Sequence, residues 1–322
     1  MISLPYIVQS PVLFLVFNRP DTTRRVFQEI KNAKPKRLYI AADGPRPGKP
    51  TDITLCREVK KIVSDIQWDC EVKTVFNEEN KGCKMAVSSA IGWFFNQEEE
   101  GIILEDDCLP ASSFFYFCDQ LLEKYRTDSR IFCITGSNLQ KGHQRGNTSY
   151  YFSQLSNIWG WASWKRVWNL YDRELSRYNE EAAIDFLKNN FQDPLLIDHW
   201  LDIFRRLKAG EIDTWDQQFQ FLTFFEGGLC VTPNINLISN IGFGADATHT
   251  FEARNHNASQ PLGEIKNILH PDFTVADKEA DYFLFNLEFR LDEKRLKIAK
   301  DKLLRRRIKK WFRGLFQKPN HS

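Results

Sequence analysis

Four short strand-like runs in the first third of the chain, separated by helical segments, constrain its fold more than any other feature. The runs cover residues 12–17, 37–42, 71–76 and 101–104 and are rich in apolar and β-branched side chains. Such runs are typical of buried strands. Strands that alternate with helices form a mostly parallel sheet with helices on both faces. The sequence therefore predicts an α/β protein whose first strands end at one common edge.

Local signals place further elements along the chain. Residues 18–21 break the first run, and Asp21 or Thr22 is expected to cap a helix that runs to about Asn32. A helix over residues 84–96 precedes the fourth run. The later pattern predicts strands at 150–152 and 229–231 and helices at 114–117, 193–208 and 216–225.

Three adjacent carboxylates, Glu105, Asp106 and Asp107, follow the fourth run directly. Like charges repel, so this arrangement favours a hard divalent cation at the strand tip. Proteins commonly hold Mg²⁺ or Mn²⁺ with one or two carboxylates while substrate phosphates complete the shell. A solvated acidic turn is the alternative that the tripeptide alone leaves open.

Polar residues also follow the other strands of the predicted sheet. Arg19 can bind a phosphate through two hydrogen bonds, and Asp43 can accept hydrogen bonds from a base or a ribose. Asn80 lies after the third strand. Each of these alone could be an ordinary loop residue, and their common placement beside the acidic tripeptide makes a ligand site the better interpretation. The chain has neither GxGxxG nor GxxxxGK[ST], so dinucleotide-binding and P-loop chemistry lose support.

Four tryptophans lie between residues 159 and 168. We expect Trp159, Gly160 and Trp161 to line a donor or acceptor pocket, because an aromatic face suits the C–H surface of a sugar and glycine allows close backbone approach. Trp164 and Trp168, four residues apart, are expected in the core.

The basic residues concentrate at the C-terminus. Residues 294–318 carry a net charge of +11, which leaves −9 for the rest of a chain whose total is +2. Leu304, Ile308 and Trp311 recur at helical spacing among arginines and lysines, so residues 302–316 are expected to lie on an anionic membrane surface. A solvated tail is the alternative. Nucleic-acid binding is not expected, because the body is acidic and no such motif is present.

Length and composition set the remaining bounds. The 322 residues contain no internal repeat or low-complexity linker, which predicts one fused domain over 1–270 followed by a basic helical tail over 271–322. No apolar run could span a bilayer, and residues 1–9 do not resemble a secretory signal. Seven scattered cysteines without a CxxC pair argue against a zinc ribbon and for reduced, mostly buried thiols.

An ordered set of motifs resembles a known family over roughly residues 10–250. The chain looks like a GT-A-type, nucleotide-sugar-dependent glycosyltransferase with a Rossmann-like sheet, and is most similar to the N-acetylglucosaminyltransferase I-like group, whose metal motif is also Glu-Asp-Asp. The motifs are Phe17–Pro20, Asp43-Gly44, Asn80–Gly82, Ile103–Asp107 before an aromatic helix, Trp159–Trp161 and Thr214–Asp216.

The resemblance implies roles for the strand-end residues. Asp107 would bind the metal directly, while Glu105 and Asp106 would contact ribose or metal-bound water. Arg19 would meet the diphosphate and Asp43 the uracil.

The resemblance also implies a catalytic base, Asp216, which would deprotonate the acceptor hydroxyl. From the residues alone, Asp216 could equally be a helix N-cap, and Gln217-Gln218 replaces the acid and aromatic of the family pattern. His249 is expected as a further metal ligand, as a late histidine is in some other GT-A enzymes, although a lone loop histidine often has no such role.

Together these features predict a glycosyltransferase that uses Mn²⁺ or Mg²⁺. It would move a sugar from a nucleotide donor, UDP-linked, to a glycan or lipid-linked acceptor with inversion. The expected setting is bacterial surface polysaccharide assembly, in the cytoplasm and peripheral on the inner membrane face. Two alternatives remain: a sugar-nucleotide nucleotidyltransferase, which would want a Gly-rich basic loop after the first strand, and a non-catalytic membrane-associated scaffold.

Overall fold

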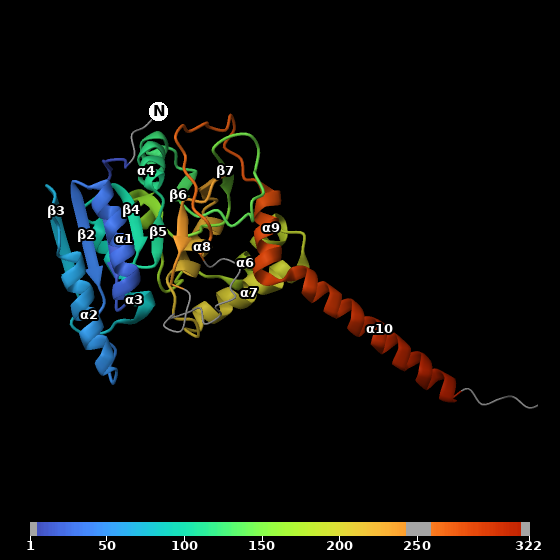
Figure 1. Cartoon of the computed structure of the whole chain (residues 1–322). Helices are drawn as coiled ribbons and strands as arrows, with labels where there is room; N and C mark the ends of the chain where they lie inside the picture. The colour runs from blue at the N-terminus through green and yellow to red at the C-terminus, as the bar shows by residue number, and fades with distance from the viewer. Residues whose placement is uncertain (1–4, 243–258, 317–322) are drawn as a thin grey trace, which may run out of the picture.

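An eight-stranded sheet forms the centre of the molecule (Figure 1). The computed structural model describes residues 5–242 and 259–316. The strand order is β3-β2-β1-β4-β8-β6-β9-β7, and β5 pairs with β10 in a small second sheet. The strands are β1 (Val12–Val16), β2 (Arg37–Ala42), β3 (Glu71–Phe76), β4 (Glu100–Glu105), β5 (Cys108–Pro110), β6 (Ile131–Thr135), β7 (Tyr150–Ser153), β8 (Trp161–Trp164), β9 (Leu229–Pro233) and β10 (Ile238–Asn240).

The sheet is mostly parallel. Strand β1 runs parallel to both β2 and β4, and β2 runs parallel to β3. Strand β8 is antiparallel to β4 and β6, β6 is parallel to β9, and β7 is antiparallel to β9. The predicted α/β class and mostly parallel sheet are therefore confirmed.

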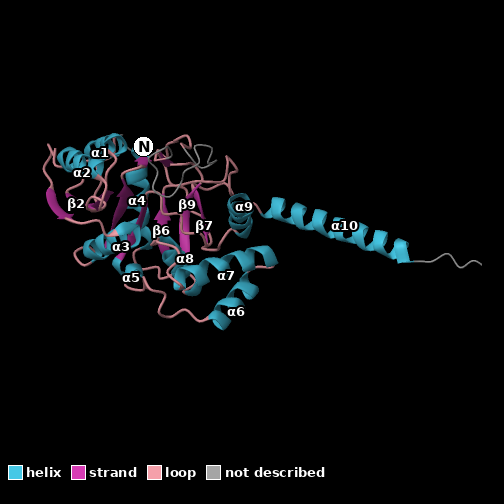
Figure 2. Ribbon diagram, turned by 90° about the horizontal axis from the view of Figure 1, so that it is seen from below, coloured by secondary structure: helices cyan, strands magenta, loops and turns pink. Residues whose placement is uncertain are grey.

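Helices cover both faces of the sheet, with α1 and α2 on one face and α3 on the other (Figure 2). Phe27 of α1 stacks on Phe14 of β1, and Phe94 of α3 meets Tyr39 of β2 edge to face. The helices are α1 (Pro20–Ala33), α2 (Pro50–Val63), α3 (Gly82–Phe95), α4 (Ser112–Tyr125), α5 (Lys165–Trp168), α6 (Glu180–Asn190), α7 (Pro194–Lys208), α8 (Asp216–Phe225), α9 (Lys278–Phe289) and α10 (Leu291–Phe316).

The start of α1 differs from the sequence prediction. Neither Asp21 nor Thr22 caps this helix: Arg19 is the N-cap residue, and its side chain makes no capping hydrogen bond. Pro20 takes the first helical position, where its fixed φ suits a helix and its missing N–H costs nothing. The helix therefore begins immediately after Arg19, which holds that residue at the end of β1.

A second apolar cluster lies beyond the sheet and involves α7, α8 and α9. Trp200, Phe224 and Phe285 meet there edge to face and are nearly fully buried. Figure 1 shows α10 leaving this region and pointing away from the body. Leu291 at its start is buried, whereas its residues 296–309 are exposed. The domain boundary at residue 270 stays a prediction.

Several burial predictions are confirmed. Trp164 and Trp168 belong to the main core. All seven cysteines are free thiols, and five of them are buried.

Asp281 of α9 generates a prediction for stability. Ser153 Oγ and the Gln154 amide donate to its carboxylate. Burial nevertheless raises the pKa of Asp281 to about 6. The folded state therefore keeps a proton that the unfolded state loses near pH 4. The stabilisation present below that pH is lost as the pH rises through about 6, by about 2–3 kcal/mol.

Asp281→Asn should remove this titration. Chemical denaturation of both proteins from pH 4 to 7.5 measures it, with the variant gaining stability relative to the wild type as the pH rises. A constant difference across the range would contradict the assignment.

Candidate active site

The carboxyl ends of β1, β2, β3 and β4 border a cavity of about 620 Å³. Apolar residues of the strands and of α3 form part of its lining, among them Leu15, Val75 and Trp93, and many of its polar groups follow the strand ends. The polar and charged residues of the lining are Arg19, Asp43, Arg46, Asn77, Asn80, Lys81, Cys83, Ser89, Glu105, Asp106, Asp107, Asp213 and Asn240, with Trp159 at the wall.

The acidic tripeptide lies at the tip of β4, as predicted. Register places Glu105 opposite Leu15 of β1, so the end of β1 lies beside the carboxylates. The Phe17 amide donates to Asp106 Oδ2 at 3.0 Å. Arg19 Nη1 lies 2.8 Å from Asp107 Oδ2 and 3.6 Å from Asp106 Oδ1.

Burial makes this cluster electrostatically costly. It raises the pKa of Glu105 well above its ordinary value, and the charges of Asp107, Asp106 and Asp216 add to the effect. Burial and Asp107 raise the pKa of Asp106 to about 7, against the stabilising charge of Arg19. Glu105 Oε1 is buried and has no hydrogen-bond partner among the described residues. The cluster therefore lacks positive charge.

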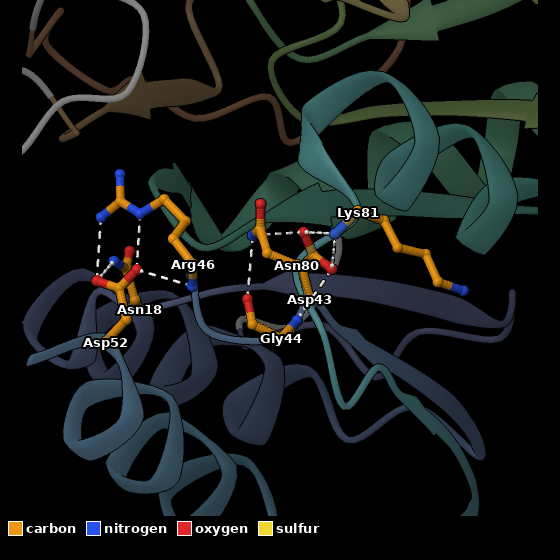
Figure 3. A network of polar contacts seen from close by, with 7 residues as sticks. All are labelled: Asn18, Asp43, Gly44, Arg46, Asp52, Asn80 and Lys81. Atoms are coloured by element: carbon orange, nitrogen blue, oxygen red, sulfur yellow. Dashed lines mark hydrogen bonds and ion pairs between the residues drawn. The ribbon is translucent and has the colours of Figure 1, made fainter. Parts of the chain in front are cut away.

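Asp43 is already engaged by the loop that follows β3 (Figure 3). Its carboxylate accepts hydrogen bonds from the amides of Gly44 and Lys81 and from the side chains of Asn77 and Asn80, at 2.8–3.1 Å. A Cβ added to Gly44 would lie 2.4 Å from the Glu79 carbonyl carbon. Asp43 and Gly44 therefore fix the loop over residues 77–81 tightly against the end of β2.

The tryptophan segment divides between the cavity and the core. Trp159 lines the cavity, as expected. Trp161 does not: it is fully buried and stacks on Trp215. Gly160 is needed for packing, because it adopts φ +58° and an added Cβ would lie 2.3 Å from Ile238 Cδ1. The expectation that all three residues line a pocket is therefore wrong for Trp161, since β8 begins there and turns its side chain into the core.

Asp216 is the first residue of α8, and Trp215 is the N-cap, so the N-cap interpretation of Asp216 is wrong. Its carboxylate accepts hydrogen bonds from Thr214 Oγ1 and, at 3.3 Å, from Gln217 Nε2. Asp216 is near enough to Glu105 to raise its pKa, yet it is Asp213 that lines the cavity. His249 lies outside the described residues.

Three charged cavity residues were missed by sequence reasoning: Arg46, Lys81 and Asp213. Arg46 lies two residues after the quoted Asp43-Gly44 motif, and Asp213 directly precedes the quoted Thr214–Asp216 motif. Lys81 belongs to the quoted Asn80–Gly82 motif, which was a usable signal.

A divalent cation fits this donor set in part. The unpartnered Glu105 Oε1 and the excess of carboxylates match the oxygen ligands that Mg²⁺ and Mn²⁺ prefer. Within the described residues, however, no three His, Cys, Asp or Glu side chains are grouped closely enough to hold an ion by themselves. The protein therefore provides an incomplete shell, which ligand oxygens would have to complete.

Comparisons with known proteins give only distant likeness. No family model and no curated protein matches the chain. Among solved structures, HddC from Yersinia pseudotuberculosis is 10% identical, with a TM-score of 0.30 over 49% of this chain and 78% of that chain.

Two further structures are similar at the same level. An apo UDP-glucose pyrophosphorylase is 9% identical, with a TM-score of 0.35 over 72% of this chain and 93% of that chain. The 4-diphosphocytidyl-2C-methyl-D-erythritol synthase from Anaerococcus prevotii DSM 20548 is 10% identical, with a TM-score of 0.34 over 67% and 95%. Likeness this low carries no argument about activity, so the functional argument rests on the site.

The role of Asp43 gives a test of local order. Asp43→Ala removes the acceptor used by four N–H donors, so the amides of residues 77–83 should exchange with solvent at least tenfold faster. Hydrogen-exchange mass spectrometry measures this rate. The exposed Asp69→Ala is the control, and unchanged exchange in residues 77–83 of Asp43→Ala would refute the role.

Proposed function

We propose that this protein is a metal-dependent glycosyltransferase that uses a nucleotide-sugar donor, UDP-linked, and transfers the sugar with inversion to a glycan or lipid-linked acceptor. The observation that carries the proposal is the acidic cluster of Glu105, Asp106 and Asp107 at the cavity, with a buried and unpartnered Glu105 oxygen.

The charge of the cavity supports the need for a metal. Its lining has five carboxylates, on Asp43, Glu105, Asp106, Asp107 and Asp213, and three basic side chains, on Arg19, Arg46 and Lys81. A divalent cation that enters with a diphosphate would supply positive charge that this acidic lining lacks and would favour ionised carboxylates. Asp107 would hold the metal, with Glu105 and Asp106 around it. When bound, the ion would neutralise charge that develops on the departing diphosphate.

The remaining steps fall to side chains of the chain. Arg19, which is paired with Asp107 and lies near Asp106, would meet the diphosphate. Asp216 would accept the proton of the acceptor hydroxyl while that oxygen attacks the anomeric carbon and the bond to the diphosphate breaks. Attack from the side opposite the leaving group inverts the configuration. Trp159 offers an apolar wall for the sugar.

The connection after β1 argues against the nucleotidyltransferase alternative. Only Phe17, Asn18 and Arg19 separate the end of β1 from the start of α1. This connection has no room for a Gly-rich basic loop. The scaffold alternative gives no reason for a buried acidic cluster.

Nucleotide binding tests the proposal. Titration calorimetry of the full chain with UDP should give micromolar binding in the presence of Mn²⁺ and at least tenfold weaker binding without it. Asp107→Ala should weaken binding similarly, because it removes a metal ligand, while the exposed Asp69→Ala should not.

The proposal fails if wild-type protein binds none of UDP, GDP and CDP. It also fails if nucleotide binds equally well without metal and in Asp107→Ala. A supporting result would justify screening nucleotide-sugar donors for transfer.

We propose in addition that α10 lies on an anionic membrane surface. Leu304, Ile308, Trp311 and Phe312 are 45–63% exposed and recur at helical spacing. Basic residues lie among them at Lys302, at positions 305–307, which are all arginine, and at Lys309. Among the described residues, no helix is long and apolar enough to cross a bilayer. An exposed apolar stripe with basic flanks fits shallow insertion into an anionic interface.

Vesicle sedimentation tests this attachment. The full chain should sediment with phosphatidylglycerol vesicles, less so at 0.5 M salt, and should stay unbound to phosphatidylcholine vesicles. Trp311→Ser combined with Phe312→Ser should reduce binding at least fivefold. Phe273→Ser, a 78% exposed aromatic outside α10, is the matched control. Equal binding of all three proteins would contradict attachment through α10.

A further inference from the structure

Arg46 is held at the cavity wall by a buried carboxylate. Its Nε lies 2.6 Å from Asp52 Oδ2 and its Nη2 lies 3.0 Å from Asp52 Oδ1. This is a two-bond arginine–carboxylate contact, which fixes the plane of the guanidinium as well as its position. Arg46 itself lies in the loop that connects β2 to α2 and lines the cavity.

Asp52 is built to hold this arginine. It belongs to the first turn of α2 and is only 1% exposed. Asn18 Nδ2 donates to its Oδ1 at 2.9 Å, and the Arg46 amide donates to its Oδ2 at 3.2 Å. The hydrogen bonds from Arg46 and Asn18 hold the pKa of Asp52 at about 2, so the carboxylate stays ionised.

The Asp52 carboxylate is buried while the Arg46 side chain is 38% exposed, and such a half-buried ion pair is weak evidence for stability, because desolvation of the carboxylate offsets much of the attraction. A role in binding explains it better. The pair sets one arginine in a single orientation before any ligand arrives, which lowers the entropy lost on binding.

Part of the guanidinium remains available to a ligand. Figure 3 shows the third guanidinium nitrogen of Arg46, Nη1, pointing away from Asp52. The hydrogen bonds that Arg46 donates to other described residues come from its backbone amide, Nε and Nη2. None of them comes from Nη1. The guanidinium carbon lies 5.5 Å from the centre of the Phe17 ring, which supports the group from one side.

Two residues first expected to bind the nucleotide are themselves paired with other groups of the site. Asp43 accepts hydrogen bonds from four donors, three of them in the loop after β3, and Arg19 is paired with Asp107 and Asp106. Arg46 therefore offers a rigid, outward-facing donor in the same cavity.

We propose that Arg46 is a nucleotide-binding residue of this site, which donates from Nη1 to an oxygen acceptor of the donor nucleotide, and that Asp52 and Asn18 position it. This inference rests on the proposed function and adds a binding residue to it. The acceptor is a base carbonyl or a phosphate oxygen, and these two sources are separable by experiment.

Arg46→Lys is the first test, because lysine keeps the positive charge facing Asp52 but cannot make the two-bond contact and has no Nη1 donor. Calorimetry with UDP and Mn²⁺ should show at least tenfold weaker binding. Arg126→Lys is the matched control. Arg126 makes the same two-bond contact with Glu100, at 2.7 and 2.9 Å, at the opposite end of β4. That control should bind UDP within twofold of the wild type.

A second pair of variants separates binding from stability. Arg46→Gln combined with Asp52→Asn removes both charges together, so the buried Asp52 charge is not left unpaired. The double variant should keep the wild-type melting temperature within a few degrees. Its affinity for UDP should still fall tenfold. Asp52→Asn alone retains Arg46 but loosens it, and should weaken UDP binding three- to tenfold.

Two ligand fragments identify the acceptor. If Arg46 meets the base, Arg46→Lys weakens uridine binding and leaves pyrophosphate binding unchanged. The reverse pattern assigns the contact to phosphate.

Wild-type affinity for UDP in folded Arg46→Lys and in the double variant would overturn the inference while leaving the proposed function standing. Wild-type protein that binds no nucleotide at all would overturn both. The two failures are therefore distinguishable.

Discussion

The contact between Arg19 and the buried carboxylates of β4 is the interaction on which the site depends. Three adjacent acids at a strand tip repel one another, and burial strengthens that repulsion. Pairing of β1 with β4 brings Arg19 within 2.8 Å of Asp107, and Pro20 starts α1 directly after it. One guanidinium cannot balance three carboxylates. The unpartnered Glu105 oxygen is the visible result of that imbalance.

Two other aspartates at the same sheet edge have a different physical role. Asp43 fixes the loop after β3, and Asp52 fixes Arg46 in the loop after β2. Both carboxylates are satisfied by donors from the chain itself, so they shape the cavity. Asp106 and Asp107 share Arg19, and Glu105 Oε1 has no donor among the described residues, so this cluster is less fully compensated. The number of hydrogen-bond donors around a carboxylate therefore distinguishes the carboxylates that hold the loops in place from those that we expect to bind a ligand. Residue type alone does not distinguish them.

The sequence predicted best those features that depend on residues close together in the chain. Strands β2 and β3 begin and end where the sequence patterns predicted, because burial and β-branched content act locally. The cap of α1 was missed, since a proline at the first helical position overrode the nearby capping side chains. Trp161 was placed wrongly for another reason: the side chain that it stacks on, Trp215, is distant in sequence.

The sequence by itself determined the α/β architecture and the placement of Arg19, Asp43, Asn80 and the acidic tripeptide along one edge, because parallel strands align their carboxyl ends whatever their loops contain. Only the tertiary structure decided which charges are compensated. Arg46 could not be recognised as a cavity residue until Asp52, on another element, was seen to hold it. Pairing between side chains depends on distances and burial that no sequence spacing contains.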